Sequence, residues 1–308
     1  MSPAPGGPGS LGPDGDHAVG TRLVRMIERV RERAAEAIFA RVAGPEGAQR
    51  RVRIHGTPGV RRFTPSDPIW RVHADASMFV GGIRALLLQS LHPLAMAGVD
   101  QHSGFRGDPW GRLQRTSGFI AETTFATTAH ADRAISAVRR IHQHIEGVAP
   151  DGRPYAASDP HLLTWVHLAE VDSFLRAHDR YGADPLSPPE RDLYVAQAAV
   201  AARLLGAEDV PETVADLEDA LAAYRPELES TPAARAAARF MLLNPPVPLA
   251  IRAPYGMLAA AAVGLLPRWA RLPLRVPWLP LTEATAVRAG GVAVTRAIGW
   301  AMAPPARS

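Results

Sequence analysis

The sequence contains no cysteine among its 308 residues. Disulfide bonds, thiolate nucleophiles, cysteine-based zinc sites and thiolate ligation of iron are therefore excluded. Any metal ion must be bound by His, Asp, Glu or Tyr. With 47% hydrophobic residues, the chain can still bury a substantial core.

Long apolar runs are also lacking. The longest uncharged apolar run covers residues 253–267, includes Pro254, Gly256 and Gly264, and is shorter than the roughly 20 residues that a membrane span needs. The first twenty residues have no apolar core of the signal-peptide kind and are rich in Pro and Gly. We expect a disordered leader over residues 1–20, no transmembrane span, and a cytoplasmic protein.

Charge of one sign does not dominate, because 34 basic residues face 30 acidic ones. This balance does not indicate a nucleic-acid partner. The local exception is the N-terminal extension over residues 21–60, where arginines share helical spacing with Leu23, Met26, Ile27 and Val30. The pattern predicts a basic amphipathic helix, which either packs on its own domain or contacts a membrane surface or partner.

Helical periodicity dominates after Pro68, and little strand-like alternation is present. The sequence therefore predicts an all-α protein with one domain over residues 61–300. Capping residues before proline open several helices, as in Ser158-Asp-Pro160. The expected helices cover residues 21–43, 71–97, 109–127, 130–147, 160–179, 188–206, 211–224, 231–243, 255–265 and 282–301.

Two cations and a hydroxyl share one face of the expected helix 109–127. Arg112, Arg115, Thr116 and Phe119 are spaced by three and four residues, which places them on the same side. A solvated arginine face with ordinary ion pairs explains this pattern, and so does a polar wall of a binding pocket.

Two histidines fall on apolar helix faces. His142 lies on the stripe of Ile135 and Val138, whereas His144 points the opposite way. His167 shares a face with Glu170, which can orient it as a ligand. Hydrogen-bonded core histidines are the alternative. A di-iron site is disfavoured because the His-x-x-Glu order is reversed and no second pair accompanies it.

The segment 71–97 carries His73 and His92 at the two ends of an apolar run. Gly81 and Gly82 in its interior allow the close approach of another helix or of a flat cofactor. Packing alone also explains both histidines and both glycines.

Buried His and Arg are costly unless a partner pairs with them. A haem provides both partners, because its iron takes imidazole and its propionates take cations. No nucleophile triad, phosphate-binding loop or aromatic nucleic-acid surface competes with this interpretation.

Ordered motifs over about residues 65–290 carry a family resemblance. They include Trp70-Arg-Val-His73, Ala85-Leu-Leu-Leu-Gln-Ser-Leu-His-Pro93, Gly111-Arg-Leu-Gln-Arg-Thr116, Val138-Arg-Arg-Ile-His142 and Leu162-Leu-Thr-Trp-Val-His167. The set resembles the MpaB/rubber-oxygenase catalytic-domain family, which includes the latex clearing proteins. The resemblance implies an all-helical fold with a globin-like core, a b-type haem and oxidative chemistry with dioxygen.

The resemblance also assigns residues. An Arg-x-x-Lys-Thr motif lines the haem pocket of latex clearing proteins and matches Arg112, Arg115 and Thr116 here, with arginine in place of lysine. A guanidinium keeps its proton, so Arg115 is not a neutral iron ligand, and hydrogen bonding to oxygen or a propionate is left to it. His142 matches the proximal histidine. The catalytic glutamate of latex clearing proteins has no counterpart upstream of Arg112.

The leading hypothesis is a haem b-dependent oxidoreductase of oxygenase type that acts on an apolar small molecule with dioxygen or peroxide. His142 is its expected iron ligand, Arg112, Arg115 and Thr116 line the pocket, and His167 and Phe119 contact the cofactor. The alternatives are a non-catalytic haem protein for sensing, storage or gas binding, and a structural helical protein with core histidines. The sequence leaves the oligomeric state open.

Overall fold

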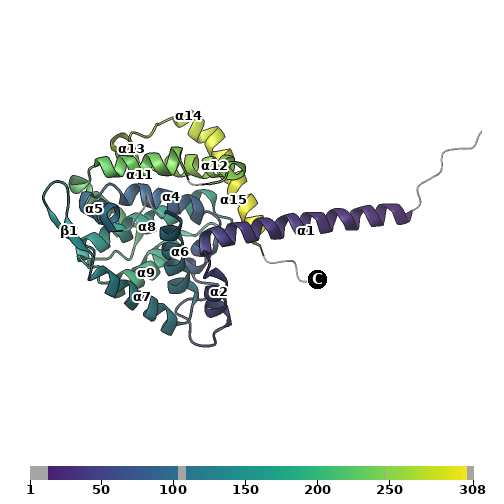
Figure 1. The fold of residues 1–308 in the computed structure, drawn as a ribbon, viewed down its shortest axis with the longest axis horizontal. Helices are drawn as coiled ribbons and strands as arrows, with labels where there is room; N and C mark the ends of the chain where they lie inside the picture. The colour runs from purple at the N-terminus through teal and green to yellow at the C-terminus, as the bar shows by residue number, and fades with distance from the viewer. Residues whose placement is uncertain (1–12, 103–108, 246, 304–308) are drawn as a thin grey trace, which may run out of the picture.

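The computed structural model describes residues 13–102, 109–245 and 247–303, and Figure 1 shows them as packed helices. The expected all-α fold is confirmed. In these ranges the strands that form a sheet are confined to one short hairpin, β1 (Glu146–Val148) with β2 (Pro154–Ala156). The globin-like core implied by the resemblance stays a prediction.

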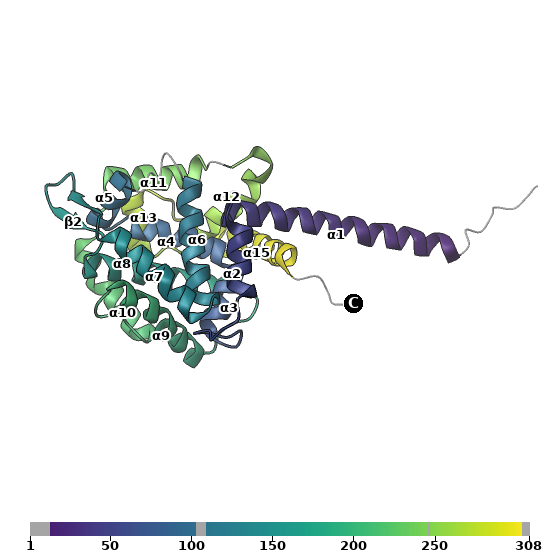
Figure 2. The ribbon, with the colours of Figure 1, turned by 60° about the horizontal axis from the view of Figure 1, so that its bottom comes forward.

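Helix α1 (Pro13–Ala43) begins earlier than expected, within the predicted leader. Residues 13–20 are helical, and residues 1–12 lie outside the described part of the chain. Figures 1 and 2 show the first half of α1 extending away from the helical body. Its last part contacts α6 (Pro109–Phe125) and α15 (Arg288–Met302), so this end of the basic helix packs on its own domain.

The expected helix 71–97 is three helices: α3 (Pro68–Ala74), α4 (Met78–Gln89) and α5 (Pro93–His102). Helices α4 and α5 meet at an angle of 107°. Proline has no amide hydrogen and disfavours helical geometry in the residue before it, so α4 ends before Pro93. The break places His92 in the turn between the two helices.

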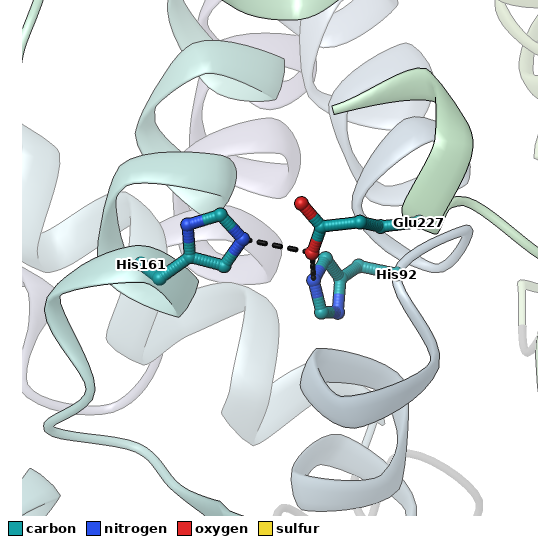
Figure 3. Close-up of side chains that lie close together, drawn as sticks. All are labelled: His92, His161 and Glu227. Atoms are coloured by element: carbon teal, nitrogen blue, oxygen red, sulfur yellow. Dashed lines mark hydrogen bonds and ion pairs between the residues drawn. The ribbon is translucent and has the colours of Figure 1, made fainter. Parts of the chain in front are cut away.

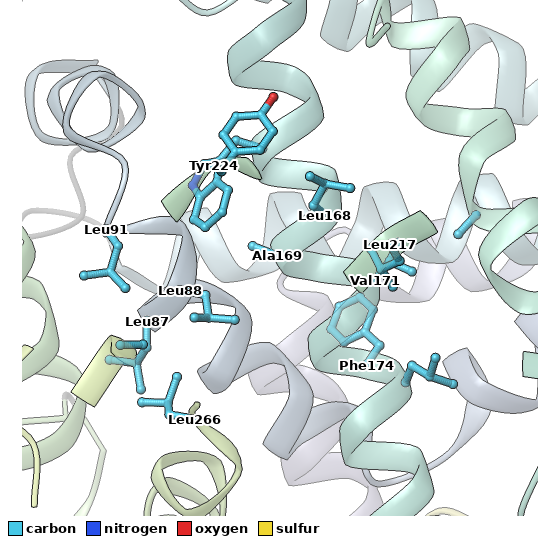
Figure 4. Packing of buried hydrophobic residues seen from close by; sticks show 14 of the residues in the cluster. Leu87, Leu88, Leu91, Leu168, Ala169, Val171, Phe174, Leu217, Tyr224 and Leu266 are labelled. Atoms are coloured by element: carbon cyan, nitrogen blue, oxygen red, sulfur yellow. The ribbon is translucent and has the colours of Figure 1, made fainter. Parts of the chain in front are cut away.

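Helix α8 (Pro160–Tyr181) runs through the core, with α4 packed along it. Asp159 caps its start by accepting a hydrogen bond from the His161 amide at 2.9 Å. Buried side chains from α4 and α8 meet others from the C-terminal half, as Figure 4 shows; these include Leu87, Leu88, Leu168, Phe174, Leu217 and Leu266. The core thus joins segments far apart in the sequence.

Helix α6 packs against both α2 (Gly47–Gly56) and α7 (Thr128–His142). We expected the α7 helix to reach residue 147, but it ends at His142 and the β1–β2 hairpin follows. Gly152 takes a φ of +88° in the hairpin turn, a conformation that favours glycine. His142 therefore lies at the end of a helix and not within one.

The remaining elements follow α8 in order. They are α9 (Pro188–Leu205), α10 (Val214–Ala223), the short helix η1 (Arg225–Glu227), α11 (Pro232–Leu243), α12 (Leu249–Leu265), α13 (Arg268–Leu274) and α14 (Pro280–Thr282), after which η2 (Glu283–Val287) leads into α15. Helices α12 and α15 pack on each other, and α12 also packs on α4. The proline-rich region thus covers the existing core, as expected from the sequence.

Candidate functional site

His73 on α3 is a satisfied core histidine. Its Nδ1 lies 2.8 Å from Thr124 Oγ1, and its Nε2 lies 3.5 Å from the hydroxyl of Tyr194. Burial lowers the pKa of His73 to about 3, so the ring is neutral. The packing explanation given for this histidine is therefore sufficient.

His167 on α8 is enclosed by protein but lacks a complete set of hydrogen bonds. Its Nε2 is buried without a hydrogen-bond partner in the described part of the chain. Burial, and secondly the charge of Arg203, lowers the pKa of His167 to about 4. A neutral imidazole with an unused buried nitrogen has the properties of a ligand.

Glu170 lies one turn after His167 on the same helix. Burial raises the pKa of Glu170 to about 7, so its carboxyl is partly protonated near neutral pH. Within the described residues, Glu170 and His167 share no hydrogen bond, so the orienting role expected for Glu170 has no support in their contacts. Titratable groups with shifted pKa values are typical of functional sites.

His142 ends α7 and is half-buried. Its Nδ1 is buried without a hydrogen-bond partner in the described ranges, and burial lowers the pKa of His142. His144 is exposed, and its Nδ1 contacts the Arg140 carbonyl oxygen at 2.7 Å. The expectation from helical phase, that His142 faces inward and His144 outward, is confirmed.

The predicted polar face of α6 divides in two. Arg112 and Phe119 are half-buried, whereas Arg115 and Thr116 are exposed. Burial lowers the pKa of Arg112, and the charge of Arg115 lowers it further. Residues 103–108, which lead into α6, lie outside the described residues. Arg112 is thus the more enclosed of the two cations.

Side chains of α6 donate hydrogen bonds to the backbone at the end of α1, which holds α6 in place. Gln114 Nε2 donates to the Arg41 carbonyl oxygen at 3.1 Å, and Ser117 Oγ donates to the Val42 carbonyl oxygen at 2.9 Å. Arg50 on α2 pairs with Glu122 at 3.3 Å. The N-terminal extension therefore positions the helix that carries Arg112.

A further cluster was not anticipated from the sequence. His92, His161 and Glu227 come from the α4–α5 turn, the first turn of α8 and η1, and each presents a ligand atom within 4.8 Å of the other two. Figure 3 shows both rings directed at the same carboxylate. The sequence marked His92 only as a core residue, and nothing in the residue pattern links it to Glu227.

Two surface pockets lie elsewhere. One of about 460 Å³ is lined by residues that include Arg84, Asp172, Arg176, Glu218 and Trp269. Another of about 500 Å³ follows η2 and α15, between Thr285 and Arg296. Neither lining includes a residue of the predicted site.

Residues 70–297 match the family model described as the ER-bound oxygenase mpaB/B'/Rubber oxygenase catalytic domain. The chain belongs to this family. No curated protein and no solved structure matches it. Since the family is one of oxygenase catalytic domains, the chain is an enzyme of oxygenase type, which uses oxygen and a small-molecule substrate.

No single helix in the described residues is long and apolar enough to cross a bilayer, and α4 with α5 pass that test only as a pair bent by 107°.

Proposed function

We propose that this mpaB/rubber oxygenase family member is a haem b-dependent oxidoreductase that acts on an apolar small molecule. The observation that carries the proposal is that two imidazole nitrogens, His142 Nδ1 on α7 and His167 Nε2 on α8, are each buried without a hydrogen bond in the described part of the chain. Leaving buried polar atoms unpaired costs about 1–3 kcal/mol each. A bound group that uses these rings removes that cost.

The histidine chemistry fits haem iron, which binds a neutral imidazole. Burial lowers the pKa values of both His142 and His167, so each is neutral near pH 7. We assign His142 as the iron ligand because its Nδ1 is buried at the end of α7 and because Val138-Arg-Arg-Ile-His142 resembles the segment with the proximal histidine in latex clearing proteins. His167 then contacts the cofactor.

Cations on α6 fit the propionates. Arg112 is partly enclosed, and a guanidinium in that position gains most from a carboxylate partner. Arg115 and Thr116 are exposed on the same helix and contribute a second cation and a hydroxyl donor at the rim. Phe119 adds an apolar surface one turn further on.

Haem, when bound, supplies electron transfer to dioxygen or peroxide. The protein's own part is to bind, orient and exclude water. Glu170 adds an enclosed carboxyl whose pKa of about 7 lets it hold or release a proton near neutral pH. If they face the oxidant and not a propionate, Arg112 and Arg115 would supply positive charge where negative charge develops on it.

The test is purification of the protein expressed with a haem supply, followed by absorption spectroscopy and oxygen-uptake measurements with a reductant and isoprenoid oligomers. We expect a Soret band and substrate-dependent oxygen uptake. A Soret band without uptake would favour a non-catalytic role in sensing, storage or gas binding. A colourless, haem-free protein would contradict the proposal.

A further inference from the structure

The His92, His161 and Glu227 cluster joins three segments that are distant in the sequence (Figure 3). Glu227 Oε2 lies 2.8 Å from His161 Nε2 and 3.5 Å from His92 Nε2. Donor atoms placed about 2.1 Å from one zinc ion lie about 3 to 3.5 Å from each other, depending on the coordination angle. The 3.5 Å separation fits this range, and the 2.8 Å separation lies just below it.

His92 supplies the observation that points to a ligand. Its side chain is 2% exposed, and its Nε2 is buried without a hydrogen-bond partner in the described residues. That nitrogen is directed at Glu227 (Figure 3). A nitrogen this deeply buried normally finds a partner, so its environment favours an additional bound species.

Tyr224 sets the tautomer of His161. Its hydroxyl lies 2.8 Å from the His161 carbonyl oxygen, to which it donates its one hydrogen. The same hydroxyl oxygen lies 3.1 Å from His161 Nδ1 and therefore accepts the Nδ1 hydrogen. The two rings are also stacked, with centroids 4.5 Å apart. His161 Nε2 is left with a lone pair that faces the Glu227 carboxylate.

A lone pair 2.8 Å from a carboxylate oxygen requires a cation between them, either a proton or a metal ion. We propose that His92 Nε2, His161 Nε2 and the Glu227 carboxylate bind one first-row divalent cation, for which Zn²⁺ is the best-suited ion. Two imidazoles and one carboxylate form a known zinc ligand set, and they suit other divalent ions of the row less selectively.

Metal binding would cost His92 one weak hydrogen bond. The Ala95 amide approaches His92 Nδ1 at 3.5 Å, a long contact at the start of α5. Metal binding at Nε2 moves the ring hydrogen to Nδ1 and removes this contact. Because the contact is long and weak, its loss is small beside three metal bonds.

The site opens toward solvent on one side. The side chains of His161 and Glu227 are 50% and 43% exposed, so the ion enters from water and keeps water in its open positions. Its ligands come from the α4–α5 turn, the start of α8 and η1, so the ion holds these three segments together.

The proposed metal site is separate from the proposed haem site. Trp165 packs near His92, and its side chain leaves α8 in nearly the opposite direction to that of His167. Metal binding therefore does not depend on haem binding.

The test is isothermal titration calorimetry with ZnCl₂ on the untagged, full-length protein. Dialysis against a chelator first removes any bound divalent metal ion. The variants are Glu227→Gln and His161→Ala, which alter exposed side chains and keep His92 in the core. His144→Ala is the matched control, because it removes an exposed histidine outside the cluster. Circular dichroism before titration verifies that each variant is folded.

We expect the wild-type protein and His144→Ala to bind one Zn²⁺ per chain with equal affinity. Each cluster variant should lose affinity by about 10- to 100-fold or more, since even residues that only support ligands contribute that much. Zinc should also raise the thermal midpoint of the wild-type protein and not that of the cluster variants. Absence of zinc binding, or wild-type affinity in both cluster variants, would overturn the proposal.

Discussion

Arg84 on α4 and Asp172 on α8 form a buried ion pair with a 2.7 Å contact, and their side chains are only 3% and 8% exposed. Arg84 also donates hydrogen bonds to Ser173 Oγ at 2.7 Å and to the Leu265 carbonyl oxygen at 2.9 Å. Burial lowers the pKa of Arg84, while the Asp172 charge opposes that shift. The pair therefore ties α4, α8 and the end of α12 together.

Removing one partner of this pair leaves an uncompensated buried charge. We expect Asp172→Ala to lower the free energy of unfolding by about 3–5 kcal/mol, measured by urea denaturation. Glu218→Ala is the control, because Glu218 pairs with Arg176 at the surface, and its loss should cost less than about 1 kcal/mol. Equal effects in the two variants would show that the buried pair has no special role.

Adjacent glycines on α4 give a matched pair of substitutions. A Cβ on Gly81 would lie 2.8 Å from Phe174 Cδ1 and 3.2 Å from its Cα, whereas a Cβ on Gly82 meets nothing within 4 Å. We expect Gly81→Ala to destabilise the protein by about 1–3 kcal/mol. Gly82→Ala should stabilise it by about 0.5–1 kcal/mol, since alanine restricts the unfolded chain. Thermal denaturation of both variants measures the difference, and a Gly81→Ala variant as stable as Gly82→Ala would contradict the α4–α8 packing.

Glu170 should make stability depend on pH. Burial raises its pKa from 4.5 to about 7, so the folded state holds more protons between these values than the unfolded state does. The free energy of unfolding therefore falls as pH rises from 4.5 through 7. Glutamine cannot ionise, so Glu170→Gln removes the cost of burying a charged carboxylate. The stability of this variant relative to the wild-type protein should increase as the pH rises from 4.5 to 7, and at pH values above 7 the difference should reach about 3 kcal/mol. Urea unfolding at pH 5 and pH 8 measures the change, and a pH-independent difference would contradict it.

Helix content and most helix positions were predictable from the sequence, because proline and capping residues mark the starts of α8 and α9 directly. The Ser187 and Glu190 capping box and the left-handed Gly206 that closes α9 are local signals of this kind. The division of 71–97 was missed because apolar periodicity continues across Asp75 and Pro93 while the helix axis turns. The hairpin at 146–156 was missed because its strands are only three residues long, which is too short for an alternating pattern of apolar and polar residues to be recognised.

The site was only partly predictable. Helical phase predicted the difference in exposure between His142 and His144, although α7 ends at His142 and His144 lies in the turn that follows. The same argument placed Arg112 with Arg115 and Thr116, yet Arg112 is half-buried whereas Arg115 and Thr116 are exposed, a difference that spacing along one helix does not encode. The His92, His161 and Glu227 cluster depends on three chain segments that meet only after folding, and no local pattern encodes that meeting.

The most direct test of the central claim is the haem content of His142→Ala compared with His167→Ala, both expressed with a haem supply and measured by absorption after haem extraction. The account predicts that His142→Ala loses the Soret band and most of the bound haem. His167→Ala should retain haem with a shifted spectrum. Loss of haem in His167→Ala together with full retention in His142→Ala would contradict the assignment of the iron ligand, and absence of haem from the wild-type protein would contradict the proposed function itself.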